Sequence, residues 1–180
     1  MKVRVILKGK HPRKVDDFYL KRDGLGLVQS EVAFSVGFPI LMTSEESLES
    51  LRKELPEDVR DTIGMKNFRA NLVIRGCSKP YEEDEFGIIN IGGARFHCDA
   101  PCGRCVFINH DPESKDPRST KHEPLKTLMR IRRNYPHIYK FNPFFGIYLI
   151  PLLNEGSIEV GQAIQIISRT EKTEVKEDNN

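Results

Sequence analysis

Short apolar runs, bounded by glycine, proline and polar residues, recur along this chain in the pattern of β-strands rather than of long helices. We predict strands at residues 3–7, 38–42, within 68–77, at 86–91, 94–97, 104–109 and 146–150, and two more within 157–167. Gly92 and Gly93 separate two of these runs and tolerate the positive φ of a tight turn, so residues 86–91 and 94–97 should form a hairpin. Many short strands and few helices predict a mainly β (α+β) fold, a β-barrel with a few peripheral helices.

One helix is indicated by its start, its buried face and its end. Thr43 and Glu46 have the spacing of a capping box, in which side chains pair with the free backbone N–H groups of a first turn. An apolar stripe follows, and Pro56 prevents the helix from continuing beyond Glu54. The residues of that stripe are Leu48, Leu51 and Leu55.

A second helix is predicted to begin at residues 123–125, where a proline occupies a first-turn position. Arg130, Arg132 and Arg133 crowd its C-terminal end, where cations complement the helix dipole. Such a run of charges is more typical of a solvated face than of a surface that docks an acidic partner.

Length and composition favour one soluble domain. The 180 residues carry a formal net charge of +2, with 30% charged residues, so the overall charge gives no reason to expect a nucleic-acid partner or an anionic membrane. No apolar run approaches the length of a membrane helix, and residues 1–20 lack the apolar block of a signal peptide. We expect one domain over residues 1–168 and a disordered polar tail at 169–180.

Three of the four cysteines lie within residues 98–105, which makes this segment the best candidate for chemistry. A thiolate is both the softest metal ligand and the strongest nucleophile among common side chains. Cys105 has the best position of the three, because a predicted loop meets a predicted strand there and can aim the sulfur at a ligand. Arg104 lies directly beside it. Cys105 is therefore the candidate metal-binding and catalytic residue.

Other interpretations of the cysteines remain open. Zinc could be bound by the three clustered thiolates together with His97 or His110, although the second cysteine pair of a zinc ribbon is absent. Disulfides are disfavoured, because a chain without a secretory signal is expected in a reducing compartment. Simple burial as small apolar residues suits Cys77 best and is an alternative for Cys98.

Several short motifs occur here in the order and spacing of MOSC domains, and the chain resembles that family over residues 38–167. The motifs are Arg-Ala-Asn at 69–71 before a strand ending in Gly76-Cys77, Cys-Gly-Arg-Cys at 102–105 before Val106, Asp-Pro at 111–112, Lys-His-Glu-Pro-Leu at 121–125 and Phe-Phe-Gly-Ile-Tyr at 144–148. Within the family, the chain resembles the mitochondrial amidoxime-reducing component and the C-terminal domain of molybdenum cofactor sulfurase.

The resemblance implies a β-barrel that binds a molybdopterin-type molybdenum cofactor, with Cys105 as the protein thiolate on the metal. It places the other cofactor contacts on Arg69, Asn71, Arg104 and Tyr148. Guanidinium groups suit the anionic and carbonyl oxygens of a pterin phosphate, and the two arginines are expected to flank the cofactor from opposite sides. The alternatives are a solvated Arg69 and a Tyr148 that is simply a strand aromatic. The family as a whole also carries a weak association with pyridoxal phosphate.

The resemblance further implies an oxidoreductase that reduces N-hydroxylated small molecules with electrons from a small haem b cytochrome and its NADH-dependent reductase. Its eukaryotic members suggest the mitochondrial outer membrane, facing the cytosol; the cytoplasm is the alternative, because residues 1–20 contain no anchor. Amidoxime-reducing members carry a companion N-terminal module, most of which this chain is expected to lack. A second hypothesis is therefore a carrier of cofactor or sulfur, with a persulfide on Cys105 or Cys102 and no redox turnover of its own.

Overall fold

The computed structural model describes residues 38–110, 122–132, 142–152 and 156–170, together with the backbone of three two-residue strands nearer the N-terminus. Those strands are β1 (Lys2–Val3), β2 (Arg13–Lys14) and β3 (Glu31–Val32). Only Val3 of the strand predicted at 3–7 falls within them, and the remainder of that prediction lies outside the described residues. The same holds for residues 171–180 of the predicted tail.

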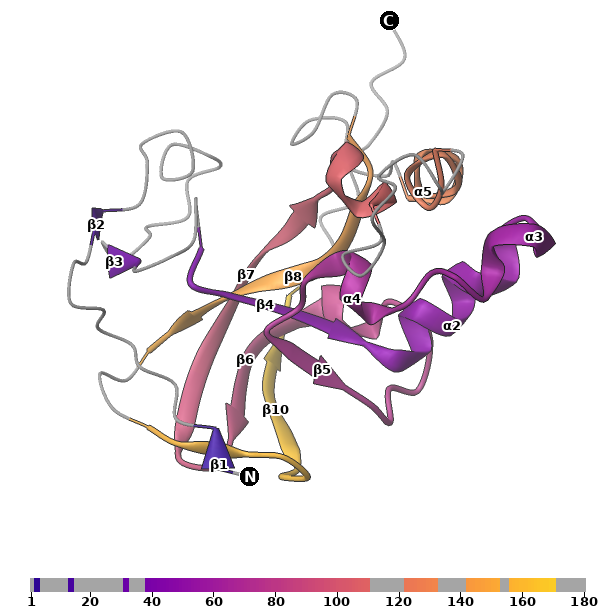
Figure 1. Ribbon diagram of the computed structural model, residues 1–180. Coiled ribbons are helices and arrows are strands. Elements are labelled where there is room, and N and C mark those ends of the chain that lie inside the picture. Colours follow the sequence, from indigo (N-terminus) through magenta and orange to yellow (C-terminus); the bar gives the residue numbers. More distant parts are fainter. Residues whose placement is uncertain are drawn as a thin grey trace, which may run out of the picture.

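A curled sheet of six strands forms the centre of the fold (Figure 1). Its order is β10 (Ile164–Arg169), β6 (Phe86–Ile91), β7 (Ala94–Gly103), β8 (Phe144–Pro151), β4 (Ile40–Ser44) and β5 (Leu72–Ile74). Neighbouring strands are antiparallel except β4 and β5, which are parallel. Two small ribbons accompany the sheet, β1 with β9 (Ile158–Glu159) and β2 with β3. The mainly β fold class is confirmed, and the sheet curls into a half-barrel.

The predicted hairpin is confirmed, and its second strand is longer than expected. Ile91 pairs with Ala94 across Gly92, which has a φ of 54°. Strand β7 then continues past His97 to Gly103 and carries Cys98 and Cys102 within the sheet. Two of the clustered cysteines therefore belong to a strand and not to a loop.

The strand predicted at 104–109 is wrong. Val106–Asn109 form a 3-10 helix, η2, and Cys105 is its N-cap. The backbone N–H of Ile108 donates to the carbonyl of Cys105 at 3.3 Å, which closes the turn. A period near three leaves Val106 and Phe107 exposed and buries Ile108 at 4% exposure. The apolar run resembled a strand because three consecutive apolar residues do not reveal their period.

Helix α2 (Glu45–Glu54) confirms the first predicted helix and corrects its cap. Ser44, not Thr43, is the N-cap, and its hydroxyl oxygen accepts from the backbone N–H of Ser47 at 3.1 Å. Thr43 still belongs to strand β4. The helix ends at Glu54 as predicted, and the leucine stripe is buried.

The other helices are short and lie to one side of the sheet in Figure 1, along with α2. They are α3 (Glu57–Arg60), α4 (Met65–Phe68) and α5 (Leu125–Ile131), with the 3-10 helix η1 at Glu82–Glu85. Helix α5 begins at Leu125, within the predicted range 123–125, and Pro124 is its N-cap and not a residue of its first turn. One apolar core fills the inside of the curled sheet, and a second packs between the sheet and the helices around Leu51, Phe68, Leu128 and Phe145.

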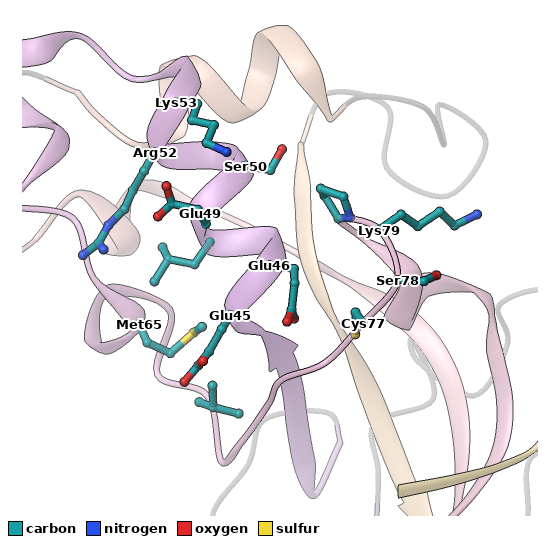
Figure 2. Close-up of a pocket in the computed structure, with 13 residues that line it drawn as sticks. Glu45, Glu46, Glu49, Ser50, Arg52, Lys53, Met65, Cys77, Ser78 and Lys79 are labelled. Carbon is teal, nitrogen blue, oxygen red and sulfur yellow. The ribbon is translucent and has the colours of Figure 1, made fainter.

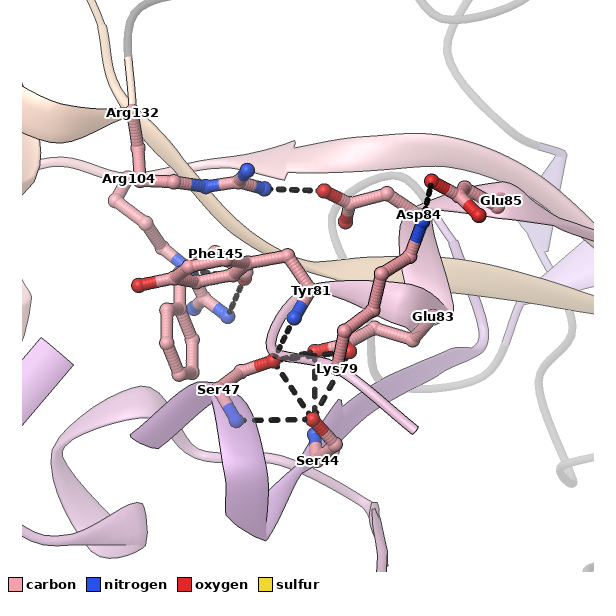
Figure 3. A network of polar contacts seen from close by, with 10 residues as sticks. All are labelled: Ser44, Ser47, Lys79, Tyr81, Glu83, Asp84, Glu85, Arg104, Arg132 and Phe145. Atoms are coloured by element: carbon pink, nitrogen blue, oxygen red, sulfur yellow. Dashed lines mark hydrogen bonds and ion pairs between the residues drawn. The ribbon is translucent and has the colours of Figure 1, made fainter. Parts of the chain in front are cut away.

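The arginine run at the end of α5 is only partly solvated. Arg130 is exposed and pairs with Glu54 at 2.9 Å, as expected of a solvated face. Arg132 is 8% exposed, and its guanidinium carbon lies 4.0 Å from the ring centre of Tyr81 and 4.2 Å from that of Phe144. It also pairs with Asp84 (Figure 3). The solvated-face prediction is therefore wrong for Arg132, because two aromatic rings and a carboxylate replace its water. Arg133 lies outside the described residues.

Candidate functional site

Cys105 is the exposed thiol of the cysteine cluster. Cys98 and Cys102 are buried, at 1% and 4% exposure. Burial raises the pKa of the Cys98 thiol to about 12, so this sulfur stays protonated and apolar in character. Cys105 follows the last strand residue by two positions and begins η2 in an extended conformation. A thiol fixed between a strand and a helical turn is held by backbone on both sides, as a ligand requires.

Cys102 connects the cluster to Tyr148 on strand β8. Its thiol lies 2.9 Å from the Tyr148 hydroxyl oxygen. The tyrosine ring stacks on Phe38, with ring centres 4.6 Å apart and planes inclined by 18°. Tyr148 is half-buried. Its ring is thus held by Phe38 and its hydroxyl by Cys102, so the side chain has a defined position beside the cysteine segment.

Asn71 reaches the same region through strand β4. Its backbone N–H donates to the Leu41 carbonyl at 2.9 Å, and its side-chain oxygen accepts from the Leu41 N–H at 2.8 Å. Leu41 is also the register partner of Tyr148 in the antiparallel pairing of β4 with β8. Leu41 of β4 therefore lies between Asn71, directly before β5, and Tyr148 on β8.

Arg69 does not lie at a strand entrance as the sequence suggested. It is the C-cap of α4, in the left-handed conformation with φ of 53°, and β5 begins only at Leu72. The side chain is exposed. The turn before it is held by Asn67, whose amide nitrogen lies 3.2 Å from the Ile108 carbonyl and 3.3 Å from that of His110. These bonds attach α4 to η2, the helix that Cys105 begins.

Asn67 is a site-building residue that sequence reasoning missed. It is 2% exposed, and its side-chain oxygen also accepts from the Gly64 N–H at 2.9 Å, which starts the short helix. An asparagine in a polar segment gives no sign of such burial. Only the spacing Gly64 to Asn67, a helix-start pattern, could have drawn attention to it.

Arg104 is buried, at 7% exposure, and its side chain is directed at backbone carbonyls. Nε and Nη2 lie 2.9 and 2.6 Å from the Phe145 oxygen (Figure 3). Nη1 lies 3.0 Å from the Phe68 oxygen. Its guanidinium carbon also stands 5.5 Å from the centre of the Phe68 ring. The prediction that Arg104 contacts a cofactor remains untested.

The structure thus brings four of the predicted residues onto adjoining elements. The candidate cofactor site consists of Arg69, Asn71, Cys105 and Tyr148, which come from the end of α4, the start of β5, the start of η2 and the middle of β8. Its donor set is one soft sulfur with a guanidinium, an amide and a phenol around it. That set fits a group that brings its own sulfur ligands to a metal and carries anionic oxygens.

A zinc centre finds no support in the described part of the chain. There, no group of three or more His, Cys, Asp and Glu side chains has the arrangement of a metal site. Of the histidines considered, His97 lies 3.6 Å from Asp99, and the His110 ring lies 6.2 Å from that of Phe107. Cys98 and Cys102 are turned into the protein, which leaves one thiol where zinc would need several.

A cavity of about 720 Å³ lies away from these residues, between α2 and the segment 77–80 (Figure 2). Glu45, Glu46 and Glu49 line it, together with Cys77. Burial, followed by the nearby carboxylates of Glu83 and Glu46, raises the pKa of Cys77 to about 12. That thiol is therefore a poor nucleophile at neutral pH, and none of the predicted site residues lines this cavity.

The chain belongs to the MOSC domain family, whose sequence pattern matches residues 29–165. This family is associated with binding of the molybdenum cofactor. The resemblance seen in the sequence is therefore confirmed.

Curated relatives refine the placement within the family. The chain is 31% identical over 166 residues to "Mitochondrial amidoxime-reducing component 1" of Homo sapiens, covering 91% of this chain and 45% of the relative. It is 35% identical over 144 residues to the Mus musculus protein of that name, covering 78% and 40%, and 34% identical over 137 residues to "Mitochondrial amidoxime reducing component 2" of Bos taurus, covering 74% and 38%. The chain spans less than half the length of each of these three relatives. Among the described residues, no helix is both long and apolar enough to cross a bilayer.

Proposed function

We propose that this MOSC domain binds a molybdopterin-type molybdenum cofactor at the candidate cofactor site, with Cys105 as its protein thiolate. The observation that carries this proposal is the single exposed thiol of the cluster, placed among elements that also present Arg69, Asn71 and Tyr148. Cys105 would supply a soft protein ligand to a metal that the pterin holds through sulfur.

The chain's own residues would orient and neutralise the bound group. Arg69, exposed at the end of α4, can pair its planar donors with phosphate or carbonyl oxygens. The side-chain oxygen of Asn71 accepts a hydrogen bond from the Leu41 N–H. The amide nitrogen of Asn71 is therefore the group that would donate to the cofactor. Tyr148 is fixed by Phe38 and Cys102. Asn71 and Tyr148 are held before binding, which reduces the ordering cost of the complex.

The reaction we propose is the reduction of N-hydroxylated small molecules. Two electrons and two protons convert an N–OH group into N–H and water, and the bound cofactor would supply the site that accepts the oxygen. A small haem b cytochrome and its NADH-dependent reductase are the proposed electron donors. The mitochondrial outer membrane, facing the cytosol, is the proposed location; the names of the relatives support the mitochondrion. Pyridoxal phosphate is not part of the proposal, because the candidate cofactor site contains no lysine for a Schiff base.

Substitution of the ligand tests the proposal directly. In Cys105→Ala we expect bound molybdenum, measured by elemental analysis, to fall at least about ten-fold, because the metal loses its protein ligand. Reduction of benzamidoxime should be lost with it. Cys77→Ala is the matched control, since it removes a thiol that lies outside the cysteine cluster of residues 98–105, and it should retain both. A Cys105→Ala protein that remains loaded and active would contradict the proposal.

The carrier hypothesis predicts a different chemical state of the purified protein. Only Cys105 among the clustered thiols is exposed enough to exchange sulfur with a donor. Mass spectrometry that finds one extra sulfur atom on Cys105, with no pterin and no molybdenum, would select the carrier over the enzyme. Stoichiometric molybdenum with a released fluorescent pterin would select the enzyme.

A further inference from the structure

Arg104 joins three segments that are distant in sequence. Its backbone N–H donates to the Pro143 carbonyl at 2.7 Å, which fixes the residue directly before Cys105. Its side chain donates to the carbonyls of Phe145 and Phe68. Phe145 belongs to β8, the strand of Tyr148, and Phe68 precedes Arg69. The segments that carry three of the four residues of the candidate cofactor site therefore meet at this guanidinium.

An irregular pairing of β7 with β8 makes the Phe145 carbonyl available to the Arg104 side chain. In the pairing of β7 with β8, Pro101 opposes Ile147 and Gly103 opposes Phe144, so Phe145 and Gly146 together face the single residue Cys102. Two residues facing one define a β-bulge, which releases backbone groups from the ladder. The Phe145 carbonyl receives two N–H donors from Arg104 at this point.

These bonds engage Nε, Nη1 and Nη2 of Arg104 and hold its guanidinium between buried groups. Phe68 and Phe145 are 1% and 0% exposed, and their rings stack with centres 4.1 Å apart. Withdrawal of the guanidinium would leave two carbonyls without donors between packed rings. Leaving two buried acceptors unpaired costs at least as much as one charge-assisted contact gains. The side chain is therefore stable where it lies.

We propose that Arg104 is a positioning residue: it fixes Cys105 relative to Arg69 and Tyr148 through the carbonyls of Phe68 and Phe145. The proposal rests on the proposed function for the identity of the bound group. Its structural content, a rigid connection of the Cys105 segment to α4 and β8, holds for the protein without any ligand. The two can therefore be tested separately.

The first experiment uses the protein without cofactor. Amide hydrogen exchange is compared for wild type, Arg104→Gln and the matched control Arg132→Gln, which also removes a buried guanidinium but none bonded to α4 or to the Cys105 segment. In Arg104→Gln we expect exchange at Arg69 and Ile108 to accelerate by about ten-fold or more, because their turns lose the tether. The control should leave both unchanged. Unaltered exchange in Arg104→Gln would overturn the positioning role whether or not the cofactor binds.

The second experiment measures cofactor affinity in a double-mutant cycle with Arg69. We expect Arg104→Gln to weaken binding about ten-fold in the wild-type background and by a smaller factor in Arg69→Ala, because part of its effect passes through Arg69. Equal losses in both backgrounds would mean an independent contact and would overturn the proposal. Arg104→Lys, which keeps the stem and the charge but not the fork, serves if the glutamine variant unfolds. It should show the same non-additivity with a smaller loss.

Discussion

Glu83 is a buried carboxylate that joins β4, α2 and η1, and its removal is expected to destabilise the whole fold. The side chain is 0% exposed. Its oxygens accept from the hydroxyls of Ser44 and Ser47 at 2.9 and 2.8 Å and from the Ser44 backbone N–H at 3.2 Å (Figure 3). Ser47 in turn accepts from the Tyr81 N–H at 2.8 Å. One carboxylate thus accepts hydrogen bonds from the end of strand β4 and from the first turn of helix α2.

The size of the effect follows from the donors that remain after Glu83→Ala. The two hydroxyls lie 2.7 Å apart, so one can donate to the other. The second hydroxyl and the Ser44 N–H are then left without acceptors, at about 1–3 kcal/mol each. Because the substitution also relieves the desolvation of a buried charge, we expect the lower part of this range, a loss of about 2–4 kcal/mol. For a chain of this length, the melting temperature should fall by roughly 5–15 °C.

Urea unfolding followed by circular dichroism measures this loss. Lys79→Ala is the control from the same region, because its ion pair with Glu85 involves a side chain that is 54% exposed and should contribute less than about 0.5 kcal/mol. Glu83→Gln, which keeps the size and one acceptor, should fall between the two. A loss below about 1 kcal/mol for Glu83→Ala, with an unchanged denaturant slope, would refute the reasoning.

Two further substitutions test the backbone and the surface charges. In Gly146→Ala the new Cβ would lie 2.6 Å from the Met42 carbonyl oxygen, at a residue with a φ of 78°, so thermal melts should show a loss of stability above about 2 kcal/mol. The control is Gly76→Ala, at a position with positive φ and open space around it. It should lose less stability, and equal losses in the two variants would disprove the clash. The Arg169 hydrogen bond holds the pKa of Glu82 below its ordinary value, so this stabilisation is present at neutral pH and is lost as pH falls through the folded pKa. Arg169→Gln should therefore lower stability at about pH 7 and not at about pH 3, and an equal loss at both would contradict the pairing.

Elements whose determinants lie close together in sequence were predictable. The hairpin required only Gly92 and Gly93 between two apolar runs, and α2 required a polar start, a leucine stripe and Pro56. The burial of charged residues was not predictable, because each partner is distant in sequence. Glu83 lies 36 and 39 positions from its two serine donors, and Arg132 lies 48 positions from Asp84. A run of charged residues in the sequence does not indicate which distant residues will pair with it.

The candidate cofactor site was also predictable only in part. The clustering of thiols alone indicated Cys105, while Arg69, Asn71 and Tyr148 came from the resemblance to a family. The local structure around two of them differs from the prediction: Arg69 ends a helix and Cys105 begins one. In both cases a backbone conformation set by tertiary hydrogen bonds replaced the strand that short apolar runs suggested.

The bulge in β8 shows why periodicity could not locate the site. A regular pairing of β7 with β8 would keep the Phe145 carbonyl in the ladder and leave Arg104 without its main acceptor. With one extra residue, made possible by the positive φ of Gly146, the carbonyl turns to Arg104, while Tyr148 still pairs with Leu41 on the other side of the strand. A second irregularity lies next to it: between the pairs Cys98–Leu149 and Pro101–Ile147, Asp99 and Ala100 together face Tyr148, which restores the register of the two strands. The position of Tyr148 relative to Cys105 therefore depends on both irregularities, and a variant that removed one of them would be expected to keep the fold class and lose the site.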